Sequence, residues 1–165
     1  MGRPTAATAG AAVVILMADD DPDDQMLAGE ALAECRLVNT IRFVGDGEEL
    51  MDYLKRQGDY SVPAAAPRPG LILLDLNMPR KNGREALQEI KADPDLRSIP
   101  VVILTTSSSE EDIAQAYDAG ANSYIAKPVT FEGLVEVMKR IRMYWLEIVE
   151  MPAVTYIYSR KEAEL

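Results

Sequence analysis

The segment Leu71-Ile72-Leu73-Leu74-Asp75-Leu76-Asn77-Met78-Pro79 contains the clearest strand signal in the chain. Four consecutive apolar residues, with Gly70 before them and Met78-Pro79 after them, predict a strand that is buried on both faces. The strand leads directly into Asp75, whose carboxylate has no packing role there. Ligands of open α/β sheets bind at the carboxyl ends of parallel strands. We therefore interpret Asp75 as a nucleophile that accepts a phosphoryl group.

Four further segments have the apolar or β-branched composition of strands, and helical patterns separate them. They are residues 13–18, 40–44, 100–104 and 121–126. Strands that are joined by helices of this length must be parallel, with helices on both faces of the sheet. The expected fold is α/β, a flavodoxin-like, doubly wound, five-stranded parallel sheet with the order 2-1-3-4-5.

Capping residues predict where the helices begin. Asp21 precedes a proline at the first helical position, and two capping boxes are expected, Asp46 with Glu49 and Ser108 with Glu111. The last helix is expected to run from near Thr130 to about Val149. We expect a loose tail over residues 1–11, one domain over residues 12–149 and a C-terminal extension over residues 150–165, with a short strand at 154–158.

The composition excludes several classes of function. The net charge is -10, and no basic face for nucleic acid is present. No apolar run approaches the roughly 20 residues that span a bilayer, so no membrane partner is expected. The chain has no histidine, which excludes a Ser-His-Asp mechanism, a histidine-ligated zinc site and a phosphohistidine on this chain. The single cysteine, Cys35, is expected in the core and suits a reducing cytoplasm.

Polar residues follow four of the predicted strands. They are Asp19 and Asp20, Asp75, Thr105, and Lys127. Parallel strands bring these ends to one edge of the sheet, where the crowded carboxylates would repel one another. A hard divalent cation reverses that repulsion. We expect Mg²⁺ (or Mn²⁺) to be held by Asp20, Asp75 and the backbone carbonyl of Asn77, together with waters.

The position of Asp75, Lys127 and Thr105 at this edge of the sheet predicts their roles in phosphoryl transfer. The metal would keep Asp75 ionised. The ammonium of Lys127 would lie beside the phosphoryl oxygens and offset their negative charge. Thr105 could donate its hydroxyl to one of them. Because the chain contains no histidine, the phosphoryl donor must be external.

These motifs, in this order, resemble the receiver domain of bacterial two-component response regulators. They are Asp19-Asp20, Leu74-Asp75-Leu76-Asn77-Met78-Pro79, Leu104-Thr105 and Tyr124-Ile125-Ala126-Lys127-Pro128. The resemblance covers roughly residues 13–149. It implies that Asp75 takes its phosphoryl group from a histidine of a sensor kinase. It also implies a signalling protein rather than an enzyme, one that promotes only its own phosphorylation and dephosphorylation.

The resemblance further implies how the switch works. Thr105 would move towards the phosphoryl group, and Tyr124 would turn inward and remodel the face formed by helix four, strand five and helix five. Asp19 would support the metal through water, and the Lys127–Pro128 bond would be cis. Because no further domain follows, we expect a stand-alone receiver, whose proline-bearing loop before strand three and whose ending resemble the regulators that pair with bacterial phytochromes. The output is expected to be a contact with an unknown downstream protein.

Simpler interpretations stand beside these. The acidic residues Asp21, Asp23 and Asp24 are explained as cap and first-turn residues that the helix dipole favours. Tyr124 could equally be an ordinary half-buried aromatic residue. A phosphatase of the haloacid-dehalogenase type is an alternative function, although that family needs a second Asp where Asn77 stands. A degenerate receiver that binds partners without phosphorylation is another.

The last helix is apolar on nearly all sides. We expect Tyr144, Trp145, Ile148 and Val149 to form a homodimer interface, because surplus apolar surface marks a contact site. The alternative is a tail that folds back on its own domain.

Overall fold

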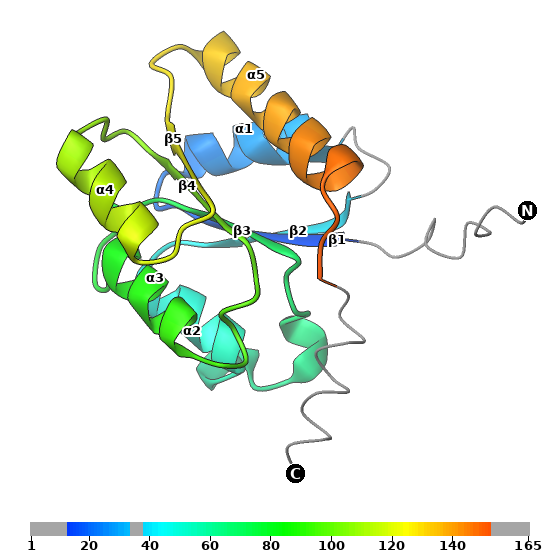
Figure 1. The fold of residues 1–165 in the computed structure, drawn as a ribbon. Coiled ribbons are helices and arrows are strands. Elements are labelled where there is room, and N and C mark those ends of the chain that lie inside the picture. The colour runs from blue at the N-terminus through cyan, green and yellow to red at the C-terminus, as the bar shows by residue number, and fades with distance from the viewer. Residues whose placement is uncertain (1–12, 34–37, 153–165) are drawn as a thin grey trace, which may run out of the picture.

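The computed structural model describes residues 13–33 and 38–152, and its centre is a five-stranded parallel sheet (Figure 1). The strands are β1 (Val13–Ala18), β2 (Val38–Val44), β3 (Leu71–Leu74), β4 (Val101–Thr105) and β5 (Ser123–Ala126). Their order is β2-β1-β3-β4-β5, and every neighbouring pair is parallel. The predicted fold class and strand order are therefore confirmed.

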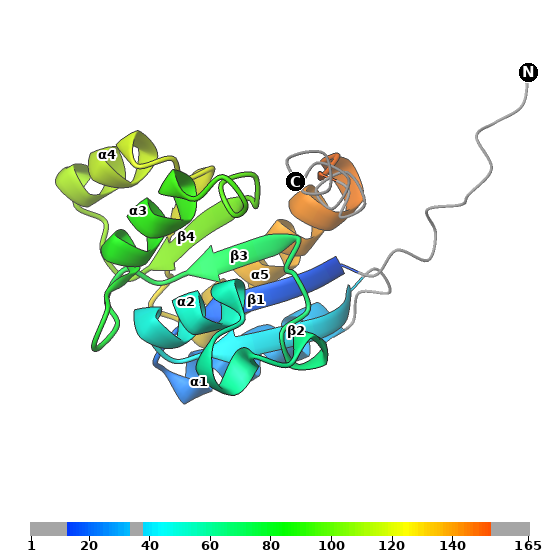
Figure 2. The same cartoon turned by 90° about the horizontal axis from the view of Figure 1, so that it is seen from below.

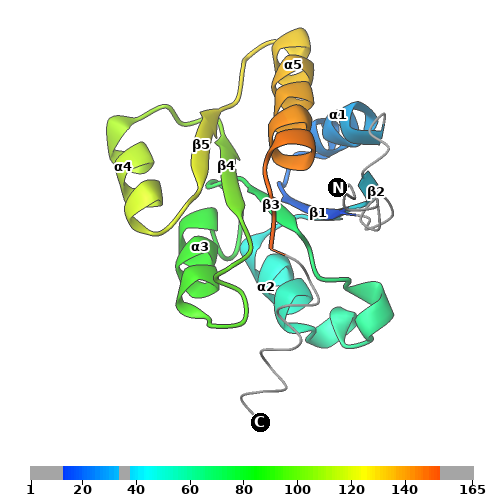
Figure 3. The same cartoon turned by 45° about the vertical axis from the view of Figure 1, so that its right-hand side comes forward.

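Helices cover both faces of the sheet, as Figures 2 and 3 show from two further sides. One layer consists of α1 (Pro22–Ala33) and α5 (Phe131–Arg142). The other consists of α2 (Gly47–Lys55), α3 (Gly83–Ala92) and α4 (Glu110–Asp118). The described residues also contain three short helical turns: η1 (Gly58–Tyr60), η2 (Pro63–Ala65) and the π-helical η3 (Met143–Ile148). None of the helices in the described ranges is long and apolar enough to cross a membrane.

Alternating side chains of the strands divide the core into two halves. In β3, Leu71 and Leu73 pack with residues of α1 and α5, whereas Ile72 and Leu74 pack with residues of α2 and α3. All four are at most 1% exposed. A strand that is buried on both faces needs an apolar residue at every position, which explains the unbroken apolar run.

Most predicted helix starts are confirmed. The Glu49 N–H donates to Asp46 Oδ1 at 2.8 Å, and Thr130 caps α5. The structure also shows Asn82 as the cap of α3. The predicted cap at Ser108 is wrong. Helix α4 is capped by Ser109, whose hydroxyl accepts from the Asp112 N–H at 3.0 Å. Adjacent serines are equally able to cap, so the sequence could not distinguish between them.

Two further predictions need correction. The last α-helix ends at Arg142, and the chain continues to Ile148 as the π-helical turn η3. None of the peptide bonds among the described residues is cis. The Lys127–Pro128 bond therefore has the trans form, which prolyl bonds also favour. The predicted tail at 1–11, Cys35 and the predicted strand at 154–158 lie outside the described residues.

Candidate functional site

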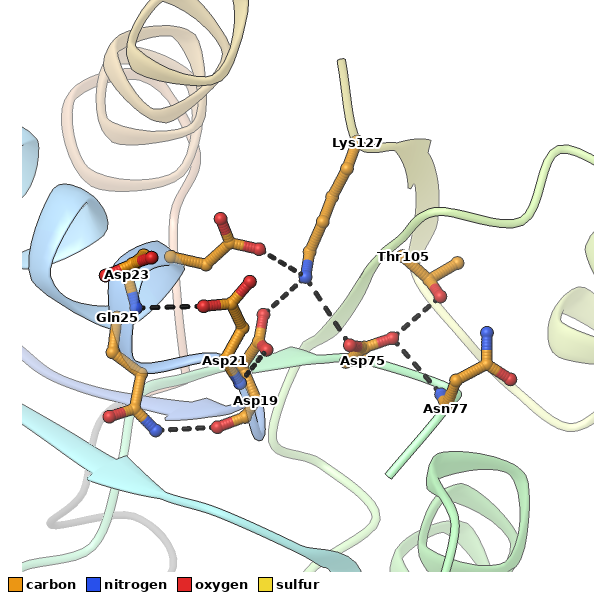
Figure 4. A network of polar contacts seen from close by, with 9 residues as sticks. Asp19, Asp21, Asp23, Gln25, Asp75, Asn77, Thr105 and Lys127 are labelled. Carbon is orange, nitrogen blue, oxygen red and sulfur yellow. Dashed lines mark hydrogen bonds and ion pairs between the residues drawn. The ribbon is translucent and has the colours of Figure 1, made fainter. Parts of the chain in front are cut away.

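The strand ends meet at one edge of the sheet, as predicted (Figure 4). The Asp75 N–H donates to the carbonyl of Ala18 at 3.0 Å, which places Asp75 beside Asp19, the residue that follows the neighbouring strand β1. Thr105 ends β4, and its carbonyl accepts from the Lys127 N–H at 2.6 Å. Sheet hydrogen bonds thus fix the backbone at each functional residue.

The Asp75 carboxylate is 7% exposed and is contacted from three directions. Its Oδ1 accepts from the Thr105 hydroxyl at 2.7 Å and from the Asn77 N–H at 3.1 Å. The Lys127 Nζ lies 3.4 Å from Oδ2. The predicted positions of Thr105 and Lys127 beside Asp75 therefore agree with the structure.

Gly83 allows α3 to start directly against the backbone of Asp75. A Cβ atom at position 83 would lie 2.1 Å from the Asp75 carbonyl oxygen, which is impossible without a backbone shift. The Gly83 N–H also donates to the Leu76 carbonyl at 3.0 Å. A glycine at position 83 is thus required by the close packing of α3 against the backbone that carries Asp75.

The loop after Asp75 is tied to the β2–α2 connection. Arg80, which has a positive φ of 62°, forms an ion pair with Asp46. Asp46 is only 2% exposed. Burial alone would raise the pKa of the Asp46 carboxyl, but the hydrogen bonds from Glu49 and Arg80 outweigh that effect and lower it. This contact holds the β3–α3 loop beside the site.

Lys127 is nearly buried, with 6% of its side chain exposed, and its ammonium pairs with three carboxylates. The Nζ lies 2.5 Å from Asp19 Oδ2, 2.9 Å from Asp24 Oδ2 and 3.4 Å from Asp75 Oδ2. Burial by itself would lower the pKa of Lys127, but its hydrogen bonds to Asp19 and Asp24 raise it overall. Lys127 is therefore a fixed positive charge.

Asp19, Asp20 and Asp75 form an acidic cluster. Each offers a carboxylate oxygen, and these oxygens all lie within 4.8 Å of one another. Burial raises the pKa of Asp19, and its contacts with Lys127 and the Asp21 N–H only partly counter this. Hard carboxylate oxygens so close together suit a divalent cation such as Mg²⁺. The role predicted for the Asn77 carbonyl stays a prediction.

Sequence reasoning missed the contact of Asp24 with Lys127. Asp24 lies in the first turn of α1 and was explained as a dipole-favoured residue. The sequence offered no separate signal for this contact, because a first-turn acid already has a sufficient local explanation. Asp21 behaves as predicted, since its Oδ1 accepts from the Asp23 N–H at 2.9 Å. Gln25 also contributes, donating to the Asp19 carbonyl at 2.6 Å.

Tyr124 is partly buried and packs against the core on the α2 and α3 side. Its hydroxyl donates to the Ser107 carbonyl at 2.8 Å, which links β5 to the loop after β4. Thr105 is fully buried, with its hydroxyl on Asp75. The switch predicted for Thr105 and Tyr124 stays a prediction.

The predicted interface residues divide into two groups. Trp145 is only 9% exposed and lies in the core beside α1 and α5, so the prediction that it faces a partner needs correction. Val149 is partly buried against the same core. Tyr144 and Ile148 are 54% and 62% exposed and remain available for a contact.

Comparisons with known proteins agree with this geometry. Residues 15–139 match the family model of the response regulator receiver domain. Over 130 residues the chain is 42% identical to the response regulator Rcp1 of Synechocystis sp., covering 79% of this chain and 86% of Rcp1.

Solved structures are similar as well. The Mn(2+)-bound form of Rcp1 matches with a TM-score of 0.81 at 42% identity, covering 86% of this chain and 99% of that one. The phosphorylated cyanobacterial phytochrome response regulator RcpA matches with a TM-score of 0.82 at 44% identity, covering 87% and 100%.

Proposed function

This chain belongs to the response regulator receiver domain family, and from this we propose that it is a phosphoacceptor switch whose Asp75 takes a phosphoryl group from a histidine of a sensor kinase. One observation carries the proposal. Lys127 and Thr105 converge on the Asp75 carboxylate beside the acidic cluster of Asp19, Asp20 and Asp75. In this proposal the chain is not an enzyme with a separate substrate, and it acts in the cytoplasm, where the ATP that phosphorylates the kinase is found.

The residues of the site have distinct tasks in phosphoryl transfer. Asp75 supplies the attacking carboxylate oxygen, and the bond from phosphorus to the donor's imidazole nitrogen breaks. Lys127 neutralises charge on the phosphoryl oxygens, and the Thr105 hydroxyl donates to one of them. Asp20, Asp75 and the Asn77 carbonyl would hold Mg²⁺ (or Mn²⁺), with Asp19 supporting it through water. The bound cation would neutralise further negative charge on the phosphoryl group.

The signal would leave the site through Thr105 and Tyr124. When the Thr105 hydroxyl engages a phosphoryl oxygen instead of Asp75, the loop that follows β4 is expected to shift. Tyr124 holds the Ser107 carbonyl in that loop, so the shift would reach the surface of α4, β5 and α5. The output is a contact with an unknown downstream protein.

We propose a phytochrome-type histidine kinase as the partner. The support is similarity to RcpA, a cyanobacterial phytochrome response regulator, over 87% of this chain. The haloacid-dehalogenase alternative has lost its support, because the family match covers residues 15–139 and Asn77 replaces the second Asp which that family needs.

The chain should take up one phosphate from a small phosphodonor. Incubation with acetyl phosphate and MgCl₂ is expected to add a single base-labile acyl phosphate, detected by intact mass and by a phosphate-sensitive gel. EDTA should suppress the gain because the acidic cluster then lacks its cation. Steady release of phosphate from small esters, without a stable phosphoprotein, would instead favour a phosphatase.

We also propose that the chain forms a homodimer through the C-terminal helix and extension. Tyr144 and Ile148 present exposed apolar side chains on η3. The dimer mass measured by light scattering should fall to that of a monomer in the variant Ile148→Glu and in a chain that ends at Glu150. The matched control is Met26→Glu on α1, since Met26 is 61% exposed. If Ile148→Glu and the truncated chain keep the dimer mass, the contact lies elsewhere.

A further inference from the structure

The three ion pairs of Lys127 are unequal in length. Its ammonium has three protons, and each can serve one carboxylate. The contacts with Asp19 and Asp24 are 2.5 and 2.9 Å long, whereas the contact with Asp75 is 3.4 Å. The ammonium is therefore drawn towards β1 and α1 and away from the residue that it must serve during phosphoryl transfer (Figure 4).

A phosphoryl group on Asp75 would add oxygens that compete for these three protons. Asp19 is poorly able to give up its share, because it is 1% exposed and a buried carboxylate without its counter-charge is costly. Its other oxygen, Oδ1, already accepts from the Asp21 N–H at 2.9 Å.

Asp24 can release the Lys127 ammonium more easily than Asp19 can, for two reasons. Its side chain is 24% exposed, so water can replace the ammonium. It also lies in the first turn of α1, where the helix N-terminus favours a carboxylate. Asp24 is therefore the carboxylate that Lys127 can release at the lowest cost.

We propose that Asp24 is a positioning residue that restrains the phosphorylation of Asp75, because it holds the Lys127 ammonium against α1 until a phosphoryl oxygen displaces it. This inference rests on the proposed function. Asp24 acts through Lys127 and does not touch the phosphoryl group. Its removal should therefore leave Lys127 closer to Asp75 and accelerate the transfer.

The first test is the initial rate of phosphorylation by acetyl phosphate in MgCl₂. Asp24→Asn keeps the size of the side chain and should raise the rate about three- to tenfold, the range expected for the net contribution of one hydrogen bond. The matched control is Asp23→Asn, which removes the same charge from the same helical turn. We expect it to change the rate less than twofold.

The second test asks whether Asp24 acts through Lys127. In a Lys127→Met background, Asp24→Asn should change the rate no more than Asp23→Asn does. In the metal-free, ¹⁵N-labelled chain, Asp24→Asn should shift the NMR signal of the Lys127 ammonium, and Asp23→Asn should leave it in place. The same spectra report whether each variant is folded.

The outcomes separate the two proposals. If the unmodified chain gains phosphate and Asp24→Asn matches Asp23→Asn, this inference is wrong and the proposed function stands. A rate increase that persists without Lys127, or an unshifted ammonium signal, also overturns the inference. If the unmodified chain gains no phosphate, the proposed function fails and the inference fails with it.

Discussion

Asp75→Asn should abolish phosphorylation, with a loss of more than about 100-fold in acyl phosphate formed with acetyl phosphate and MgCl₂. An amide nitrogen in place of a carboxylate oxygen cannot attack phosphorus in the same way, and it would face the Lys127 ammonium that now lies 3.4 Å from Oδ2. The Thr105 hydroxyl can still donate to the remaining oxygen, so the fold should persist. Intact mass after a fixed incubation measures the gain.

The matched control is Asp59→Asn, an exposed carboxylate in η1. It removes the same charge and should take up phosphate at the unmodified rate. Phosphate on the Asp75→Asn chain at a normal level would show that another side chain is the acceptor. The role assigned to Lys127 and Thr105 would then be lost as well.

Trp145→Ala should lower the free energy of unfolding by about 3–5 kcal/mol. Trp145 is 9% exposed and lies in the core between η3 and the layer of α1 and α5, so its removal leaves a large cavity. Its ring also meets Tyr144 edge-on, with a centroid distance of 5.6 Å. Urea unfolding, followed by circular dichroism, measures the change.

Val129→Ala is the matched control for loss of apolar side chain. Val129 is fully exposed in the loop before α5, so its truncation should change the free energy of unfolding by less than about 0.5 kcal/mol. Trp145→Ala could instead change the free energy of unfolding as little as Val129→Ala does and reduce the dimer mass to that of a monomer. That result would show that the indole packs against a second chain.

The strands and the central site could be predicted because both depend on simple, local signals. The apolar run of residues 71–74 marks a doubly buried strand, and a parallel sheet gathers its carboxyl ends whatever lies between them. Asp75, Thr105 and Lys127 each stand at such an end. Their convergence therefore follows from the topology alone.

Features that depend on tertiary packing could not be predicted. A first-turn acid such as Asp24 has a sufficient local explanation, and only the tertiary fold brings it to Lys127, the residue after β5. Trp145 lies in a segment that is apolar on nearly all sides, so the sequence pattern does not tell which side faces the core. Burial against α1 and α5 decided that question.

The buried position of Trp145 gives the protein its own optical reporter. It is the single tryptophan of the chain, so the indole emission of the protein reports on the surroundings of this one residue. An indole shielded from water emits at shorter wavelength than a solvated one, and its emission should move to the red when η3 detaches from α1 and α5. Titrations with metal or a small phosphodonor can therefore follow the C-terminal turn without any attached dye.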